Sequence, residues 1–130
     1  MDGRLLMVES DNLFWSRLVE RLRQERFHVY MTDADCRFEI NEMLKKNKID
    51  VVVIDLSELK REGLMILESI QQSQPMTEVI LINSSDQISL SIEGMKLGAY
   101  NDFMLPLDMD YFLSGVREAV FKKKQQEKKH

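Results

Sequence analysis

Acidic residues follow two of the short apolar runs, and they are the strongest candidates for chemistry in this sequence. Glu9 and Asp11 follow one run, and Asp55 ends a run of branched aliphatic residues. If both runs are neighbouring parallel strands, their carboxyl ends bring Glu9 and Asp55 to one edge of a sheet. Clustered carboxylates with a backbone carbonyl are ligands that suit Mg²⁺. The alternative is structural: Glu9 or Asp11 caps a helix, and Asp55 only ends a strand.

The elements that must position these residues are visible as an alternation of short apolar runs and amphipathic stretches. Continuous apolar runs of four or five residues are typical of strands that are buried on both faces, as in parallel sheets. Five runs of this kind occur, at residues 5–8, 27–31, 51–54, 79–82 and 103–105.

Five stretches with helical spacing lie between and after these runs. In the fourth, Ile88, Ile92 and Met95 follow i, i+4, i+7 spacing and share one face of the predicted helix. Asp108 is a suitable cap for the fifth. Strand and helix alternate five times, which predicts an α/β fold with a parallel sheet covered by helices on both sides.

Composition limits the class of protein. The chain has 130 residues, enough for one domain, and its single cysteine, Cys36, excludes an internal disulfide. No apolar run is long enough to cross a membrane, and the start of the sequence lacks the pattern of a signal peptide, so we expect a cytoplasmic protein.

The net charge of −4 is unevenly distributed. The last nine residues carry five Lys and one Glu, and the rest of the chain carries 13 basic and 21 acidic residues. We therefore expect no direct nucleic-acid binding by the acidic body, and no membrane association. The basic residues 122–130 are expected to form a tail, a linker or a solvated helix end. Contact of this tail with nucleic acid or an anionic membrane is the alternative.

Five motifs follow one another in order: LLMVESD, DVVVIDL, KREGLMIL, VILINSS and GAYNDFMLP. With them, the sequence from residue 4 to about residue 121 resembles a response-regulator receiver domain of two-component signalling. The resemblance implies a flavodoxin-like (βα)5 fold, a doubly wound parallel sheet with strand order 2-1-3-4-5. It gives a receiver domain at residues 1–121, followed by the basic tail at residues 122–130.

The resemblance also implies a role in phosphorelay signal transduction rather than an enzyme. Asp55 is the expected phosphoacceptor, and a histidine kinase or a phosphotransfer protein is the expected donor and partner. Mg²⁺ is the expected cofactor, held by Glu9, Asp55 and the backbone carbonyl of Ser57, with Asp11 as a further candidate. A flavodoxin-like cofactor binder is a distant alternative, because no glycine-rich phosphate loop follows the first strand.

Four positions depart from the family pattern. Ser10 stands where the family has a second acidic residue, and Leu105 stands where it has a Lys. Asn83, followed by Ser84, stands where the family has a phosphate-contacting Thr or Ser, and Asp102 where it has the aromatic switch residue. Without that acid and that cation, we expect weak or absent Mg²⁺ binding and weak phosphotransfer. The alternative function is a pseudo-receiver, a protein-interaction module that works without phosphorylation.

The family pattern also points to a surface for self-association. We expect a homodimer through the face formed by the fourth helix, the fifth strand and the fifth helix, within residues 86–121. Four side chains are the expected exposed candidates on this face: Leu90, Leu97, Tyr111 and Leu113.

Overall fold

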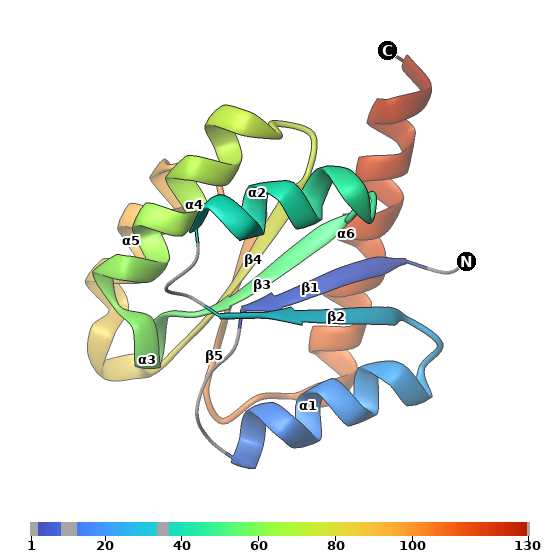
Figure 1. The fold of residues 1–130 in the computed structure, drawn as a ribbon. Helices are drawn as coiled ribbons and strands as arrows, with labels where there is room; N and C mark the ends of the chain where they lie inside the picture. Colours follow the sequence, from blue (N-terminus) through green and yellow to red (C-terminus); the bar gives the residue numbers. More distant parts are fainter. Residues whose placement is uncertain (1–2, 9–12, 34–36, 130) are drawn as a thin grey trace.

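One parallel sheet of five strands forms the centre of the molecule (Figure 1). The structure is a computed structural model that describes residues 3–8, 13–33 and 37–129. The strand order is β2-β1-β3-β4-β5, which confirms the order 2-1-3-4-5 and the flavodoxin-like fold expected from the sequence. The strands are β1 (Arg4–Val8), β2 (His28–Thr32), β3 (Val51–Asp55), β4 (Glu78–Asn83) and β5 (Asn101–Met104).

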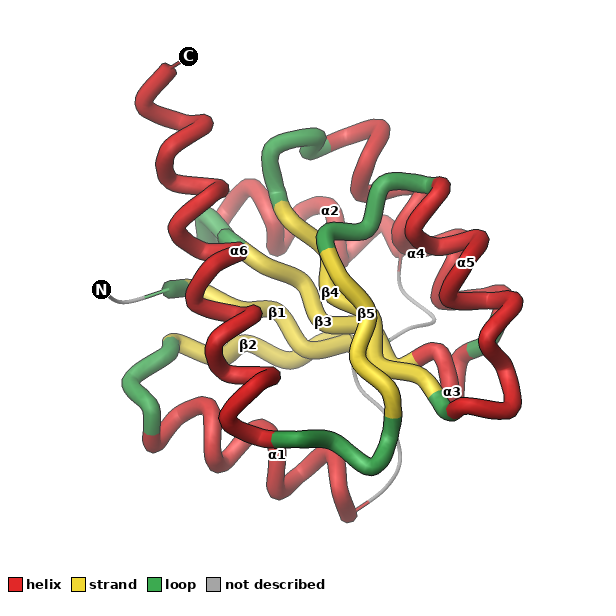
Figure 2. The backbone as a smooth tube through the Cα atoms, turned by 180° about the vertical axis from the view of Figure 1, so that it is seen from behind, coloured by secondary structure: helices red, strands yellow, loops and turns green. Residues whose placement is uncertain are grey.

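Helices cover both faces of this sheet (Figures 1 and 2). One face is covered by α1 (Leu13–Gln24) and α6 (Met109–Lys129), and the other by α2 (Arg37–Lys46), α4 (Arg61–Ser73) and α5 (Ile88–Lys96). Two short elements were not expected from the sequence: α3 (Leu56–Leu59) and the 3₁₀ turn η1 (Ser85–Gln87).

Alternation along the strands divides the core into two layers. On β3, Val51 and Val53 pack on the side of α1 and α6, while Val52 and Ile54 pack on the side of α2 and α4. All four side chains are fully buried, as a strand covered on both faces requires. The short strand β5 lies at the sheet edge and begins at the polar residue Asn101, earlier than the apolar run at 103–105 predicts.

Helix α5 packs on the sheet through small residues. Ser91 and Gly94 are buried, and a Cβ atom on Gly94 would lie 2.4 Å from Cδ1 of Leu81. The backbone of α5 therefore comes close to β4 only because this position has no side chain. The predicted helix is present, but its apolar stripe faces solvent, with these exposed fractions: Ile88 57%, Ile92 53% and Met95 41%.

Helix α6 continues without a break through the basic segment to Lys129, and its last turns extend past the sheet (Figures 1 and 2). Two neighbouring lysines attach it to the amino-terminal edge of the sheet. Nζ of Lys123 lies 3.3 Å from Oδ1 of Asp50, and Nζ of Lys122 lies 3.0 Å from Oε2 of Glu78. None of the described helices is both long enough and apolar enough to cross a membrane.

Candidate functional site

The carboxyl ends of β3 and β4 place two polar side chains on neighbouring strands. Asp55 ends β3 opposite Ile82 of β4, and Asn83 is the next residue of β4. This edge of a parallel α/β sheet is where ligands bind in folds of this kind. The other expected site residues at this edge, Glu9, Ser10 and Asp11, lie outside the described residues.

The Asp55 carboxylate is only 2% exposed and is oriented by the turn that follows it. Its Oδ1 accepts hydrogen bonds from the backbone N–H of Ser57 at 3.0 Å and from the Ser57 hydroxyl at 2.5 Å. Asp55 thereby caps the short helix α3, whose first residue, Leu56, is buried. Gly63 at the start of α4 lets that helix approach Leu56 closely, because a Cβ there would lie 2.7 Å from Leu56 Cδ2.

Asn83 is fully buried, and its side chain is bonded to the start of α5. Its Nδ2 donates to the backbone carbonyl of Gln87 at 2.7 Å and to Oγ of Ser91 at 2.9 Å. Its Oδ1 accepts a hydrogen bond from the backbone N–H of Ser84 at 2.8 Å. Both amide protons and the carbonyl oxygen of Asn83 therefore have partners, all of them in the segment that joins β4 to α5 or in α5 itself.

Asp55 and Asn83 leave the sheet on opposite faces. The alternation on β3 places Asp55 on the side of α1 and α6, the same side as Val53. On β4, the same rule places Asn83 with Leu81, on the side of α5. The structure thus brings the two residues to one edge of the sheet, with their side chains on opposite faces.

The remaining positions at this edge are occupied by other contacts. The hydroxyl of Ser84 donates to Oδ1 of Asp86 at 2.5 Å. Leu105 packs against the core layer under α1 and α6, and its backbone N–H donates to the carbonyl of Asn83 at 2.8 Å. Asp102 is half-buried on β5, so its carboxylate keeps contact with solvent.

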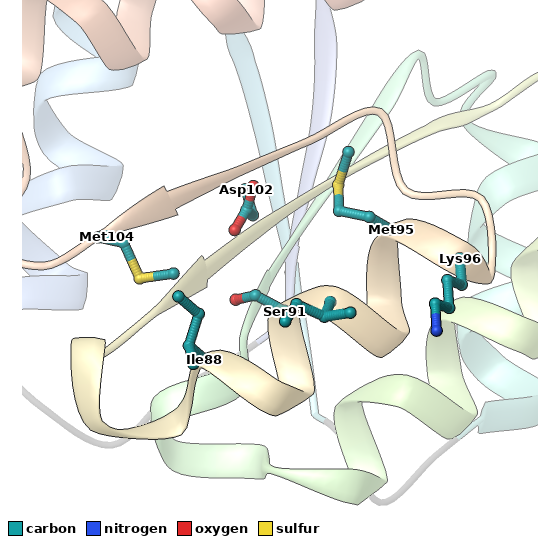
Figure 3. A pocket seen from close by; sticks show the side chains of 7 residues that line it. Ile88, Ser91, Met95, Lys96, Asp102 and Met104 are labelled. Atoms are coloured by element: carbon teal, nitrogen blue, oxygen red, sulfur yellow. The ribbon is translucent and has the colours of Figure 1, made fainter.

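A shallow groove of about 470 Å³ lies between α5 and β5. Figure 3 shows the residues of α5 on one side and Asp102 and Met104 of β5 on the other. The exposed stripe of α5 supplies most of its apolar lining, and Lys96 and Asp102 add one charge of each sign.

The side chains expected on this face are arranged differently from the sequence-based prediction. Tyr111 is exposed, Leu90 and Leu97 are half-buried, and Leu113 is buried. Sequence reasoning also missed Gln87 and Ser91 as partners of Asn83. A serine among the apolar positions of the predicted fourth helix was the available signal for Ser91.

Among the described residues, no group of three or more acidic, His or Cys side chains is placed to hold a metal ion. Of the expected metal ligands, the described residues include only Asp55 and Ser57 at the sheet edge, because Glu9 and Asp11 lie outside them. Mg²⁺ is usually bound by one or two carboxylates and keeps several waters.

Residues 5–117 match the family model described as the response regulator receiver domain. The chain is 25% identical over 118 residues to the transcriptional regulatory protein GlrR of Escherichia coli, covering 91% of this chain and 26% of GlrR. It is 21% identical over 115 residues to the chemotaxis protein CheY of Listeria monocytogenes, covering 88% of this chain and 97% of that protein.

The fold is also similar to a crystal structure of NtrX from Brucella abortus in complex with ADP. The TM-score is 0.84 at 19% sequence identity, over 98% of this chain and 28% of that chain. This chain therefore spans about a quarter of the length of GlrR and of NtrX, and nearly all of the chemotaxis relative.

Proposed function

Because the chain belongs to the response regulator receiver family, a family of two-component signalling modules rather than catalytic enzymes, we propose that it signals mainly as a protein-interaction module with weak phosphotransfer to Asp55. The observation that carries the proposal is the position of Asn83. The family pattern has a phosphate-contacting Thr or Ser at the end of β4, where this chain has Asn83. The side-chain amide of Asn83 instead donates hydrogen bonds to the Gln87 carbonyl and the Ser91 hydroxyl, at the start of α5.

Turning Asn83 toward Asp55 has a definite energetic cost. The movement breaks the bonds to the Gln87 carbonyl and to the Ser91 hydroxyl, and Ser91 is only 2% exposed. A buried polar group that loses its partner costs about 1–3 kcal/mol. We therefore propose that α5 keeps one position, whether or not Asp55 is modified.

The electrostatics of the site support the same proposal. Transfer of a phosphoryl group depends on charges that neutralise the phosphoryl oxygens. Leu105 supplies no charge where the family pattern has Lys, and Ser10 supplies a neutral hydroxyl where it has an acid. Both changes remove stabilisation from the transition state.

A phosphoacceptor role for Asp55 is the second candidate function. Its support is the position of the carboxylate at the carboxyl end of β3, where the hydrogen bonds from Ser57 fix its orientation. In this role, a histidine kinase or a phosphotransfer protein is the donor.

Treatment with acetyl phosphate and Mg²⁺ distinguishes the two candidates. An Asp55 oxygen attacks the phosphorus, the bond from phosphorus to the acetate oxygen breaks, and acetate leaves with the electron pair. We expect intact-mass measurement to find one added phosphoryl group in a minor fraction of the chains, and none in Asp55→Asn. Asp86→Asn, which alters another carboxylate near the same edge, is the matched control and should keep the wild-type fraction. Rapid and complete labelling of the wild type would refute the proposal of weak transfer.

Mg²⁺ binding is expected to be weak for the same reason. A titration followed by the fluorescence of the buried Trp15 should respond only at high millimolar Mg²⁺. Ser10→Asp, which adds a carboxylate, should move the midpoint to a lower concentration. Saturation of the wild-type chain below one millimolar would contradict this expectation.

The groove between α5 and β5 is the proposed docking surface for the partner protein. A helix with two or three apolar residues along one face fits the stripe Ile88, Ile92 and Met95, and the charges of Lys96 and Asp102 can orient it. We place this interaction in the cytoplasm, the compartment in which receiver domains act.

A further inference from the structure

We propose that the outer face of α6 binds the same face of a second copy of this chain, with the two helices antiparallel. The inference does not depend on whether Asp55 accepts a phosphoryl group. It uses the face of the sheet opposite to α5, so the groove between α5 and β5 stays free. A helix of 21 residues is about 30 Å long, which is sufficient for a dimer contact.

Phe121 gives this face an apolar centre. The side chain is 53% exposed and itself lines two hollows of the surface. One hollow, of about 240 Å³, is lined by Phe27, Arg117 and Val120. The other, of about 570 Å³, is lined by residues that include Tyr100 and Arg117. In a two-fold dimer, each Phe121 can enter a hollow of the other copy, a geometry in which a buried aromatic ring contributes strongly to binding.

The charges along α6 determine the direction of the partner helix. The first half, with its cap, exposes three acids: Asp108, Asp110 and Glu118. The second half exposes two lysines at its end, Lys128 and Lys129, in addition to Lys122, which is already paired with Glu78. An antiparallel pair places the acidic half of each copy against the basic half of the other, whereas a parallel pair places like charges together. This face is therefore self-complementary in charge only in the antiparallel arrangement.

Two residues of α6 have the opposite sign to their half, and both are held within the chain. The guanidinium of Arg117 lies 2.8 Å from Oε1 of Glu25, and Nζ of Lys123 lies 2.8 Å from Oε1 of Glu127. The hydrogen bonds from Arg21 and Arg117 hold the pKa of Glu25 below its ordinary value. Arg117 and Glu127 thus already have partners and do not oppose the proposed pairing.

The basic half of α6 alone would also attract an anionic surface such as a nucleic-acid backbone. The acidic half of the same helix repels such a surface, and the acids outnumber the cations over the whole chain. In a second copy bound antiparallel, the acidic half of one α6 faces the basic half of the other at both ends, so the charges favour self-association.

The test is sedimentation velocity of the full chain over a range of concentrations. We expect a monomer–dimer equilibrium that weakens at about 1 M NaCl, where the screening length is about 3 Å. Phe121→Glu should raise the dissociation constant at least about 10-fold, the effect of losing a central aromatic contact. Phe38→Glu is the matched control, because Phe38 is a 78% exposed phenylalanine on α2, and it should leave the equilibrium unchanged. Circular dichroism verifies that each variant is folded.

Charge reversal tests the antiparallel direction. Asp110→Lys with Glu118→Lys should weaken the dimer, and so should Lys128→Glu with Lys129→Glu. All four changes in one chain should restore it, because the halves are then complementary again. A chain that is monomeric at every concentration would overturn the proposal. So would a dimer that Ile92→Glu dissociates and Phe121→Glu does not, and so would a failure of the four changes to restore binding.

Discussion

Leu105→Lys is expected to raise the rate at which acetyl phosphate modifies Asp55 by roughly 10- to 100-fold, because one preorganised charge at a developing anion has an effect of about this size or larger. Leu105 directly precedes Pro106 and lies at the end of β5, close to the edge that carries Asp55. It is only half-buried, so a lysine there can keep its ammonium group in solvent or turn it to the phosphoryl oxygens.

The measurement is the initial rate of phosphoryl addition by intact mass, at one Mg²⁺ concentration. Leu105→Met, with a neutral side chain of similar length, is the control and should match the wild-type rate. The same lysine in an Asp55→Asn background should give no product. If Leu105→Lys left the rate at the wild-type level, the missing cation would not be what limits transfer, and the proposed explanation would be wrong.

Lys123→Met is expected to lower the free energy of unfolding by about 3 kcal/mol, because it leaves a buried carboxylate without its cation. The side chains of Lys123 and Asp50 are only 8% and 6% exposed. Asp50 also accepts a hydrogen bond from the backbone N–H of Arg4 at 2.9 Å, so it links α6, β1 and the start of β3. Loss of the ammonium group therefore affects three elements at once.

Urea denaturation measures this loss, and an ion pair exposed on both sides provides the control. Arg61→Met removes the pair with Glu93, whose side chains are 72% and 44% exposed, and a surface pair of this kind contributes about 1 kcal/mol or less. Asp50→Asn combined with Lys123→Met should recover most of the stability, because Asn keeps an acceptor for Arg4 and carries no charge. Equal effects of Arg61→Met and Lys123→Met would contradict the burial argument.

The sheet was predictable from the sequence because its central strands are uniformly apolar. The runs at 51–54 and 79–82 contain no polar residue, and short, branched runs of this kind are typical of strands covered on both faces. The strand order followed from the motifs, since periodicity alone does not decide which strands are neighbours. The short helix α3 could not be expected, because it depends on Asp55 and Ser57 forming a cap.

The orientation of α5 and of Asn83 was not accessible from the sequence. Spacing shows that Ile88, Ile92 and Met95 share a face, but it does not show whether that face meets the sheet or the solvent. The small side of α5, with Ser91 and Gly94, faces the sheet because these residues allow the helix to pack closely on β4. The direction of the Asn83 side chain then follows from Ser91, a partner eight residues later in the chain.

The small-residue contact of α5 has a consequence for local unfolding of the domain. A helix that buries mainly a serine and a glycine gains little free energy from the hydrophobic effect, so it opens at a lower cost than helices that bury large side chains. Its amide protons should therefore exchange with solvent sooner than those of α4, which buries Leu64, Ile66, Leu67 and Ile70. The hydrogen bonds from Asn83 to Gln87 and Ser91 then stabilise the beginning of this helix. A protein that covers the apolar stripe would slow this exchange and complete the burial that the isolated domain leaves unfinished.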